Sequence, residues 1–224
     1  MLHGVGRVSV DPFALFLSPE RFSGQMRLLA RLGLRGVSLA ELRAAEDRGQ
    51  ARGLVGLTFD DAYRDVLDWA PPVLAGYGFT ATVFAVSGLL GGENAWDPPP
   101  RRRLMDADDL RRLVREGWEL GSHGATHVRL AGLDAEQLQH EVAGSRSALA
   151  GVTGVPPTTF CYPYGSVDEA SVEAVRAAGY SAACAVRPPP GLDRELASPR
   201  LGVAERDHPL RLAARLLLSG HRSR

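Results

Sequence analysis

Leu57-Thr58-Phe59-Asp60-Asp61 ends an apolar run with two adjacent carboxylates. In a strand, neighbouring side chains point to opposite faces, so the two acids are expected to have separate roles. Like charges this close repel each other unless one carboxyl is protonated or a cation lies beside them. A metal ion would let one aspartate act as a ligand while the other stays ionised as a base. The alternative is that the pair caps the helix that follows, because aspartate is a favoured N-cap residue.

The bulk composition predicts an ordinary globular protein. A chain of 224 residues is long enough for one domain with a substantial core, so we expect a single domain over residues 1–224. The hydrophobic content of 45% and the charged content of 23% are ordinary values. The formal net charge of +0 lacks the basic excess of a dedicated nucleic-acid binder, and we expect no nucleic-acid partner. Two cysteines are too few for a disulfide framework.

The same composition bears on location. No hydrophobic stretch is long enough to cross a bilayer, so we expect no membrane span. The first residues lack the charged and apolar regions of a signal peptide. The chain as given is therefore expected to be cytoplasmic, or associated with the cell envelope if its start is incomplete.

Apolar runs with strand propensity alternate with helical patterns along most of the chain. This alternation predicts a parallel β/α architecture, and in a β/α barrel the chemistry lies at the carboxyl ends of the strands. The predicted strands lie within residues 1–10, 34–37, 54–59, 80–86, 117–122, 160–162, 181–186 and 200–203. The predicted helices begin after Ser18 and Ser38 and cover residues 63–75, 106–116, 134–151, 167–178 and 208–218, and residues 219–224 are expected to be a frayed tail.

His123-Gly124-Ala125-Thr126-His127 places two imidazoles four residues apart at the end of a predicted strand. On a helical turn such residues share a face and can bind one metal ion. Two histidines and one aspartate suit zinc and leave open positions for water and substrate. A His-x3-His pair alone is often a surface coincidence. Together with Asp60-Asp61 at another strand end, it predicts a catalytic metal site.

Three motifs in this order resemble one family. Thr58-Phe59-Asp60-Asp61, Ser122-His123-Gly124-Ala125-Thr126-His127 and Tyr162-Pro163-Tyr164-Gly165 resemble the motifs of the polysaccharide deacetylase family, also called the NodB-homology domain or carbohydrate esterase family 4. The resemblance covers nearly the whole chain. It implies an α/β fold, a distorted β/α barrel of the NodB-homology type. It also implies a hydrolase that removes N-acetyl groups from an N-acetylglucosamine-containing polysaccharide, oligosaccharide or glycoconjugate.

The resemblance implies a role for each motif residue. Asp61, His123 and His127 match the family's metal ligands, with Zn2+ as the expected ion and Co2+ or Ni2+ as alternatives. Asp60 matches the general base that removes a proton from the attacking water. The backbone N–H of Tyr164 matches a donor to the tetrahedral oxyanion.

Two departures from the family pattern leave parts of this mechanism open. Cys161 stands where the family often has an arginine that braces the base, and Arg200 is a candidate for that role. The Leu-x-His motif that supplies the general acid is not found, and His3 and His208 are candidates to replace it. Trp96, in the irregular stretch 87–103, is a candidate for stacking on a sugar ring, with a hydrophobic loop anchor as the alternative.

Two other functions are compatible with the sequence. One is hydrolysis of a non-peptide C–N bond in a small amide on the same fold. The other is a catalytically weak carbohydrate-binding protein. The second is disfavoured by Asp60, because a pure binder has no need of a base beside the metal ligands.

Overall fold

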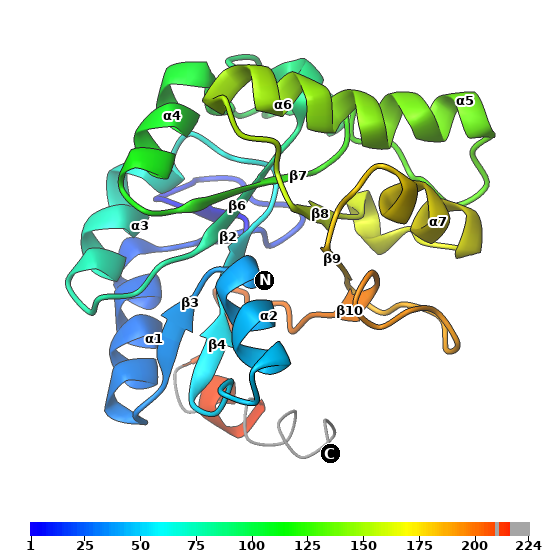
Figure 1. Cartoon of the computed structure of the whole chain (residues 1–224). Coiled ribbons are helices and arrows are strands. Elements are labelled where there is room, and N and C mark those ends of the chain that lie inside the picture. Colours follow the sequence, from blue (N-terminus) through cyan, green and yellow to red (C-terminus); the bar gives the residue numbers. More distant parts are fainter. Residues whose placement is uncertain (209–210, 216–224) are drawn as a thin grey trace.

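A curled sheet of six parallel strands forms the centre of the protein, in the spatial order β10-β9-β8-β7-β6-β5 (Figure 1). The computed structural model describes residues 1–208 and 211–215. From β5 to β9, consecutive strands are linked by segments that contain a helix, as parallel neighbours require. The strands are β5 (Thr58–Phe59), β6 (Thr82–Ala85), β7 (Glu119–Ser122), β8 (Thr159–Cys161), β9 (Ala182–Ala185) and β10 (Ser198–Pro199).

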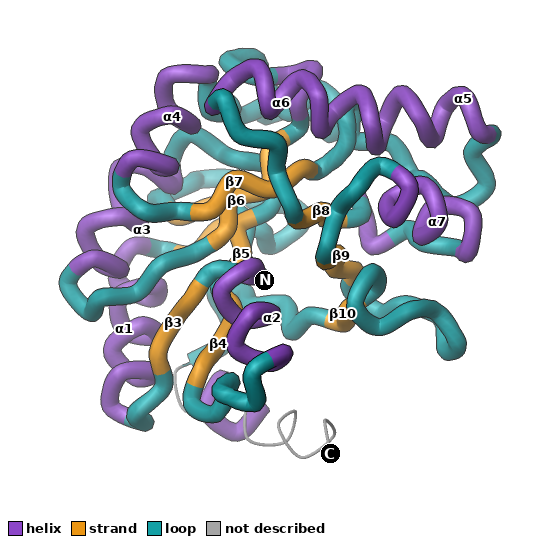
Figure 2. Tube along the Cα trace, in the orientation of Figure 1, coloured by secondary structure: helices purple, strands orange, loops and turns teal. Residues whose placement is uncertain are grey.

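Helices lie around the outside of this sheet (Figure 2). Three of them begin at a capping box, in which an aspartate side chain accepts a backbone N–H of the first turn: Asp106, Asp134 and Asp168. These helices start close to the residues that the sequence predicts. The crossover helices are α3 (Val66–Ala75), α4 (Ala107–Arg115), α5 (Ala135–Leu138), α6 (Ser145–Thr153) and α7 (Glu169–Ala177).

The N-terminal residues complete the architecture beside β5. Leu2 forms a parallel bridge with Phe59, so the chain start runs along the open side of β5. Two small parallel pairs follow, β1 (Gly4–Val5) with β2 (Phe16–Leu17), and β3 (Arg35–Val37) with β4 (Leu54–Gly56). Helices α1 (Pro19–Arg31) and α2 (Leu39–Asp47) belong to the same region. As predicted, Ser18 caps α1, and Gly33 follows its last turn with a left-handed φ of 71°.

The hydrophobic core lies between the sheet and the helices. The ring of Phe59 in β5 packs against Phe22 of α1 and Trp118, with centroids 5.9 and 5.4 Å away. All residues of β6, β8 and β9 are buried, as expected for a parallel sheet covered on both faces. This packing fixes the positions of the strand ends, where the motif residues lie.

The strand predicted over residues 54–59 is divided between two sheets. Its first half is β4, which pairs with β3, and its second half is β5 of the central sheet. Leu57 lies between them, donating its N–H to Val37 and accepting at its carbonyl from Thr82. The prediction of one continuous strand was wrong because the two halves pair with different neighbours.

The turn after β5 also differs from the prediction. Asp61 and Ala62 have positive φ angles of 69° and 56°, and Tyr63 pairs with Leu104 in an isolated bridge. The next helix therefore begins at Val66 rather than at residue 63, and its N-cap residue is Asp65. Asp60 and Asp61 do not cap this helix, so the alternative in which the two acids serve as helix caps is excluded.

Other boundaries were predicted less well. The helix predicted over residues 134–151 contains a π-helical stretch, η2 (Gln139–Gly144). The strand predicted over residues 200–203 is absent, and β10 lies just before it. Of the helix predicted over residues 208–218, the structure describes residue 208 and residues 211–215, and the latter are helical. The rest of that helix and the predicted tail 219–224 lie outside the described residues.

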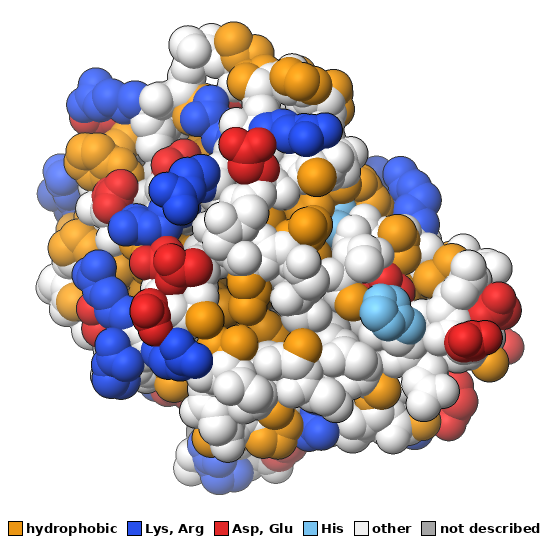
Figure 3. Space-filling model, turned by 90° about the horizontal axis from the view of Figure 1, so that it is seen from above, with side chains coloured by type: hydrophobic (Ala, Val, Ile, Leu, Met, Phe, Trp, Pro, Cys, Tyr) orange, Lys and Arg blue, Asp and Glu red, His pale blue; other side chains and the backbone are white. Residues whose placement is uncertain are grey.

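The helix surfaces carry paired charges. On α4, Arg111 pairs with Asp108 at 2.7 Å and Arg112 with Glu116 at 2.8 Å. Figure 3 shows arginine and acidic side chains side by side over one face of the molecule. Such exposed pairs contribute little to stability. None of the described helices is long and apolar enough to cross a membrane.

Candidate active site

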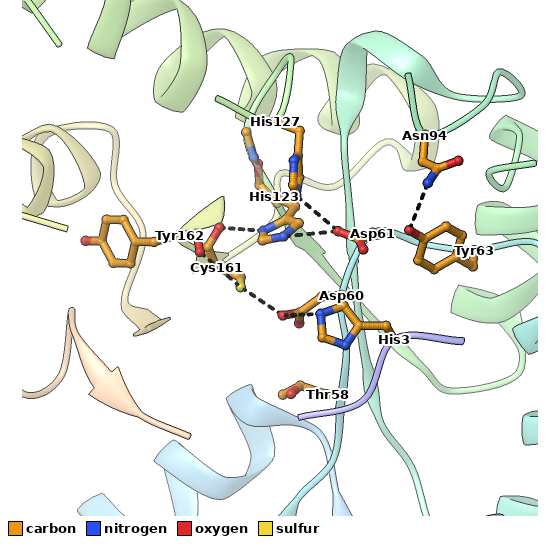
Figure 4. Close-up of polar contacts among 12 residues, drawn as sticks. His3, Thr58, Asp60, Asp61, Tyr63, Asn94, His123, His127, Cys161 and Tyr162 are labelled. Carbon is orange, nitrogen blue, oxygen red and sulfur yellow. Dashed lines mark hydrogen bonds and ion pairs between the residues drawn. The ribbon is translucent and has the colours of Figure 1, made fainter. Parts of the chain in front are cut away.

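The predicted site residues meet at the carboxyl ends of neighbouring strands (Figure 4). Asp60 and Asp61 follow β5, His123 follows β7, and Tyr164 lies in the turn after β8. Among the described residues, four of the five non-glycine residues with positive φ lie in these segments, at Asp61, Ala62, His127 and Tyr164. Backbone in this region is strained, and such strain is concentrated at functional sites.

Asp61, His123 and His127 form a compact buried group. The Nε2 atoms of His123 and His127 lie 3.3 and 3.2 Å from Asp61 Oδ1. One ligand atom of each residue lies within 4.8 Å of those of the other two. Asp61 Oδ1 is buried and accepts no well-formed hydrogen bond from the described residues. The expected helical turn between the histidines is absent, and the pair is brought together instead by a left-handed His127, φ 64°.

The hydrogen bonding of His123 indicates which nitrogen is available to a ligand. Its Nδ1 lies 2.7 Å from the carbonyl oxygen of Cys161, which can only accept, so Nδ1 carries the proton. In the neutral ring, Nε2 then presents a lone pair toward Asp61 Oδ1. Two acceptors facing each other in a buried site require a proton or a metal cation between them. The group therefore fits a divalent metal ion.

The pKa shifts of Asp61, His123 and His127 come from burial and from the contacts between the carboxylate and the imidazoles. Burial by itself lowers the pKa of His123, but the contacts with Asp61 and Asp60 raise it above the ordinary value. Burial lowers the pKa of His127. Burial opposes ionisation of Asp61, but its contacts with the two imidazoles lower the pKa of this carboxyl. The carboxylate side of the group thus favours positive charge at the imidazoles or between them.

A second set of potential ligands, Asp60, His123 and Cys161, shares one histidine with the first. Arg200 is already hydrogen-bonded to two of these three residues. Its guanidinium donates to both Asp60 oxygens and, at 2.9 Å, to Cys161 Sγ. A guanidinium here satisfies the ligand atoms and repels a metal ion. The group of Asp61, His123 and His127 is therefore the better candidate for a metal site.

Asp60 is held by Arg200. The two nitrogens of the guanidinium lie 2.6 and 2.7 Å from Oδ1 and Oδ2 of Asp60, a bidentate pair. Arg200 also donates to Thr58 Oγ1 at 3.0 Å. Burial by itself raises the pKa of the Asp60 carboxyl, but the charge and hydrogen bonds of Arg200 hold it well below the usual range. The predicted contact between Arg200 and the base candidate is confirmed.

Cys161 lies beside this pair. Its Sγ is 3.6 Å from Asp60 Oδ2, and burial raises the pKa of the thiol well above its ordinary value. The residue therefore stays a neutral thiol at the position where an arginine is common in the family pattern. Arg200 approaches the same carboxylate from the segment after β10, so the brace comes from a different part of the chain.

Of the two candidates for the general acid, the structure brings one to the site. His3 Nε2 lies 3.9 Å from Asp60 Oδ2, because residues 1–5 run beside β5 (Figure 4). His208 is exposed and follows Asp207, whose carbonyl accepts a hydrogen bond from Gln25 in α1. No described contact links His208 to Asp60.

Trp96 covers one ligand of the group. Its ring stacks on His127 with the centroids 4.0 Å apart and an interplanar angle of 22°. The partly buried ring also packs against the hydrophobic core, as expected of an anchor for the loop 87–103, and stacking on a sugar ring stays a prediction. The ring of Tyr164 lies edge-on to His127, 4.6 Å away.

Glu141 is a site residue that the sequence analysis missed. It is buried in the π-helical stretch η2, and its carboxylate accepts from the N–H groups of Ala125 and Thr126 at 2.8 and 3.0 Å, and from Thr126 Oγ1 at 2.5 Å. These three bonds hold the loop between the two histidines. In the sequence, Glu141 is one of several acids on a predicted helix, and nothing local distinguishes it.

We expect Glu141→Gln to weaken metal binding by about 10–100-fold, the usual cost of losing a residue that orients metal ligands. Both loop N–H groups donate to Oε2, so the amide oxygen can keep these two bonds, but they lose the negative charge that strengthens them, and the Thr126 hydroxyl loses its acceptor at Oε1. The measurement is a competition titration with a chromophoric chelator, together with thermal unfolding. Glu136→Gln, an exposed acid on α5, is the matched control. Metal affinity equal to the control would show that Glu141 does not position the histidines.

Comparison with known proteins identifies the family. The chain matches the polysaccharide deacetylase family over residues 47–183. It is 26% identical over 177 residues to "Putative polysaccharide deacetylase YxkH" of Bacillus subtilis (strain 168), covering 78% of this chain and 60% of that protein. It is 32% identical over 129 residues to a chitin deacetylase of Pestalotiopsis sp, covering 55% of this chain and 38% of that protein. The chain thus spans less than two thirds of the length of these relatives.

Solved structures share the fold. The structure of Streptococcus pyogenes deacetylase PplD in complex with acetate is similar with a TM-score of 0.80 at 19% identity, covering 95% of this chain and 94% of that chain. BC0361, a polysaccharide deacetylase from Bacillus cereus, is similar with a TM-score of 0.78 at 22% identity, covering 95% and 66%. At these identities the likeness establishes the fold, and it confirms the predicted NodB-type α/β architecture. By its motifs, its fold and the match over residues 47–183, the chain belongs to the polysaccharide deacetylase family.

Proposed function

We propose that the protein is a metal-dependent deacetylase that acts on an N-acetylglucosamine-containing polysaccharide, oligosaccharide or glycoconjugate. The observation that supports this most is the pairing of two neighbouring aspartates with different partners. Asp61 faces two imidazoles, whereas Asp60 is held ionised by Arg200. A buried ionised carboxylate beside a metal-ligand group is the arrangement that hydrolysis needs, a base next to a Lewis acid.

Asp61, His123 and His127 would hold the metal, with Zn2+ as the first choice and Co2+ or Ni2+ as alternatives. When bound, the ion supplies Lewis-acid polarisation of the acetamide carbonyl and lowers the pKa of water toward about 7.

The chain's own residues carry the proton transfers. Asp60 takes a proton from the water that attacks the carbonyl carbon, and Arg200 holds the carboxylate in place. The backbone N–H of Tyr164, turned by its φ of 57°, donates to the oxygen that becomes negative. His3 gives a proton to the sugar nitrogen as the C–N bond breaks. The products are acetate and a free amine.

The test is acetate release from N-acetylglucosamine oligomers by protein reconstituted with Zn2+, Co2+ or Ni2+. We expect release that is lost on treatment with a chelator and restored by the metal. Asp61→Asn should bind metal poorly and release acetate only at the level of metal-free protein. Asp108→Asn, an exposed acid on α4, should behave as the wild type.

Two outcomes would refute the proposal. Metal-bound protein that hydrolyses small non-sugar amides, and not the oligomers, would assign it to small-amide hydrolysis. Metal-bound protein that binds oligomers without releasing acetate would make it a carbohydrate-binding protein.

A further inference from the structure

A surface hollow adjoins the metal-ligand group. Its volume is about 660 Å³, and it is lined mainly by apolar and aromatic side chains, with Trp96, His127, Val128, Arg129 and Tyr164 among them. His127 belongs both to the hollow and to the metal-ligand group. A ligand in the hollow would therefore lie beside the reacting group.

Arg129 is the cation of this hollow. Its guanidinium lies over the Tyr164 ring, 4.5 Å from the centroid. Within residues 1–208 and 211–215, no carboxylate pairs with Arg129 and no acceptor takes a hydrogen bond from it. The guanidinium of Arg200, by contrast, donates hydrogen bonds from both of its terminal nitrogens to Asp60. A cation–π contact uses the face of the guanidinium, so its N–H groups stay available at the edge.

The acids near the hollow have other partners. Asp97, half-buried in the loop 87–103, accepts from the side-chain amide of Asn94 at 3.1 Å. Asp61 faces the two imidazoles. No carboxylate contacts Arg129 within the described residues, and its exposed guanidinium lies against the Tyr164 ring, beside an aromatic surface.

We propose that this hollow binds a sugar unit that carries a carboxylate or phosphate and adjoins the unit that is deacetylated. The inference rests on the proposed function and narrows its substrate to an anionic N-acetylated glycan. The Trp96 and Tyr164 rings offer apolar surface for the pyranose, and Arg129 offers paired N–H donors, whose spacing fits two oxygens of a carboxylate or phosphate. A neutral oligomer leaves these donors to water.

The first test compares three oligomers of equal length: a neutral N-acetylglucosamine oligomer, one with a carboxylate ether on alternate units, and one with a phosphate there. We expect a lower KM for an anionic oligomer than for the neutral one. Arg129→Gln should raise KM for the preferred anionic oligomer by about 10-fold, the lower end for a hydrogen bond to a charged group, with little change in kcat. The comparison of the two anions identifies which of them is bound.

Arg129→Lys keeps the charge but not the paired donors, so it should recover only part of the affinity. Arg115→Gln, an exposed arginine on α4, is the matched control. Equal KM values for neutral and anionic oligomers, or an equal effect of Arg129→Gln on both, would overturn the inference.

A binding measurement separates this inference from the proposed function. Calorimetric titration with each oligomer, on protein without added metal, measures binding without turnover. Preferential binding of an anionic oligomer that is lost in Arg129→Gln supports the subsite even if no acetate is ever released. Binding that ignores the anion refutes the subsite even if the deacetylase assay succeeds.

Discussion

Asp60→Asn is expected to lower kcat for acetate release by about 10²–10⁴-fold, the usual contribution of a positioned base. The amide cannot take a proton from the attacking water, and it replaces a carboxylate that Arg200 holds ionised. Metal content should stay at the wild-type level, because the ligand atoms of Asp61, His123 and His127 are unchanged. The measurement is acetate release at saturating substrate, with bound metal measured on the same samples.

The variant must be shown to be folded, because it leaves the Arg200 charge buried beside a neutral group. Thermal unfolding and circular dichroism of the same preparation supply that control. A folded, metal-loaded Asp60→Asn protein with kcat within a few-fold of the wild type would remove Asp60 from the role of base. His3, 3.9 Å from the same carboxylate, would then be the next candidate.

The sequence predicted which residues would meet, because the geometry of parallel strands does most of that work. The carboxyl ends of adjacent parallel strands lie at one edge of a sheet, so polar residues that directly follow β5, β7 and β8 must be neighbours. Asp60, Asp61 and His123 satisfy this condition, and Tyr164 lies in the turn shortly after β8. The motif order added the roles that the resemblance implies, and those roles stay predictions until the variants are measured.

The backbone that orients these residues was not predictable in the same way. A His-x3-His pair is compatible with a helical turn, yet the loop here is held open by Glu141 and closes through a left-handed His127. Hydrogen bonds between a loop and a distant helix leave no periodic pattern in the sequence. For the same reason the division of residues 54–59 depends on pairing partners that lie elsewhere in the chain.

Arg200 illustrates the limit most clearly. It lies 140 positions from Asp60 in the sequence, and its segment does not form the strand that was predicted there. Only the absence of an arginine at Cys161 suggested that another cation must replace it. A buried carboxylate requires such a partner, so Arg200 was a candidate for the brace, but no local pattern placed it beside Asp60.

Arg200→Met is expected to lower the free energy of unfolding by about 3–5 kcal/mol, the usual effect of removing one partner of a buried ion pair. The side chains of Arg200 and Asp60 are only 8% and 4% exposed, so water cannot replace the lost partner. The Asp60 carboxylate would lose its bidentate donors, and Thr58 and Cys161 would lose theirs. The measurement is equilibrium unfolding in urea. Arg176→Met is the matched control, because its side chain and that of its partner Asp193 are 46% and 35% exposed, so losing this pair should lower the free energy of unfolding far less.

The double variant Asp60→Asn/Arg200→Met separates the lost pair from the lost packing. If the single variants are unstable because each leaves an unpaired buried charge, the double variant, which has neither charge, should be destabilised by clearly less than their sum. Its acetate release should remain as low as that of Asp60→Asn, since restoring stability does not restore a base. Additive losses would mean that the two side chains contribute separately, and Arg200 would then be a packing residue rather than the brace of Asp60. Stability and activity respond differently in this cycle, so it separates the contribution of the ion pair to the fold from the role of Asp60 as the base.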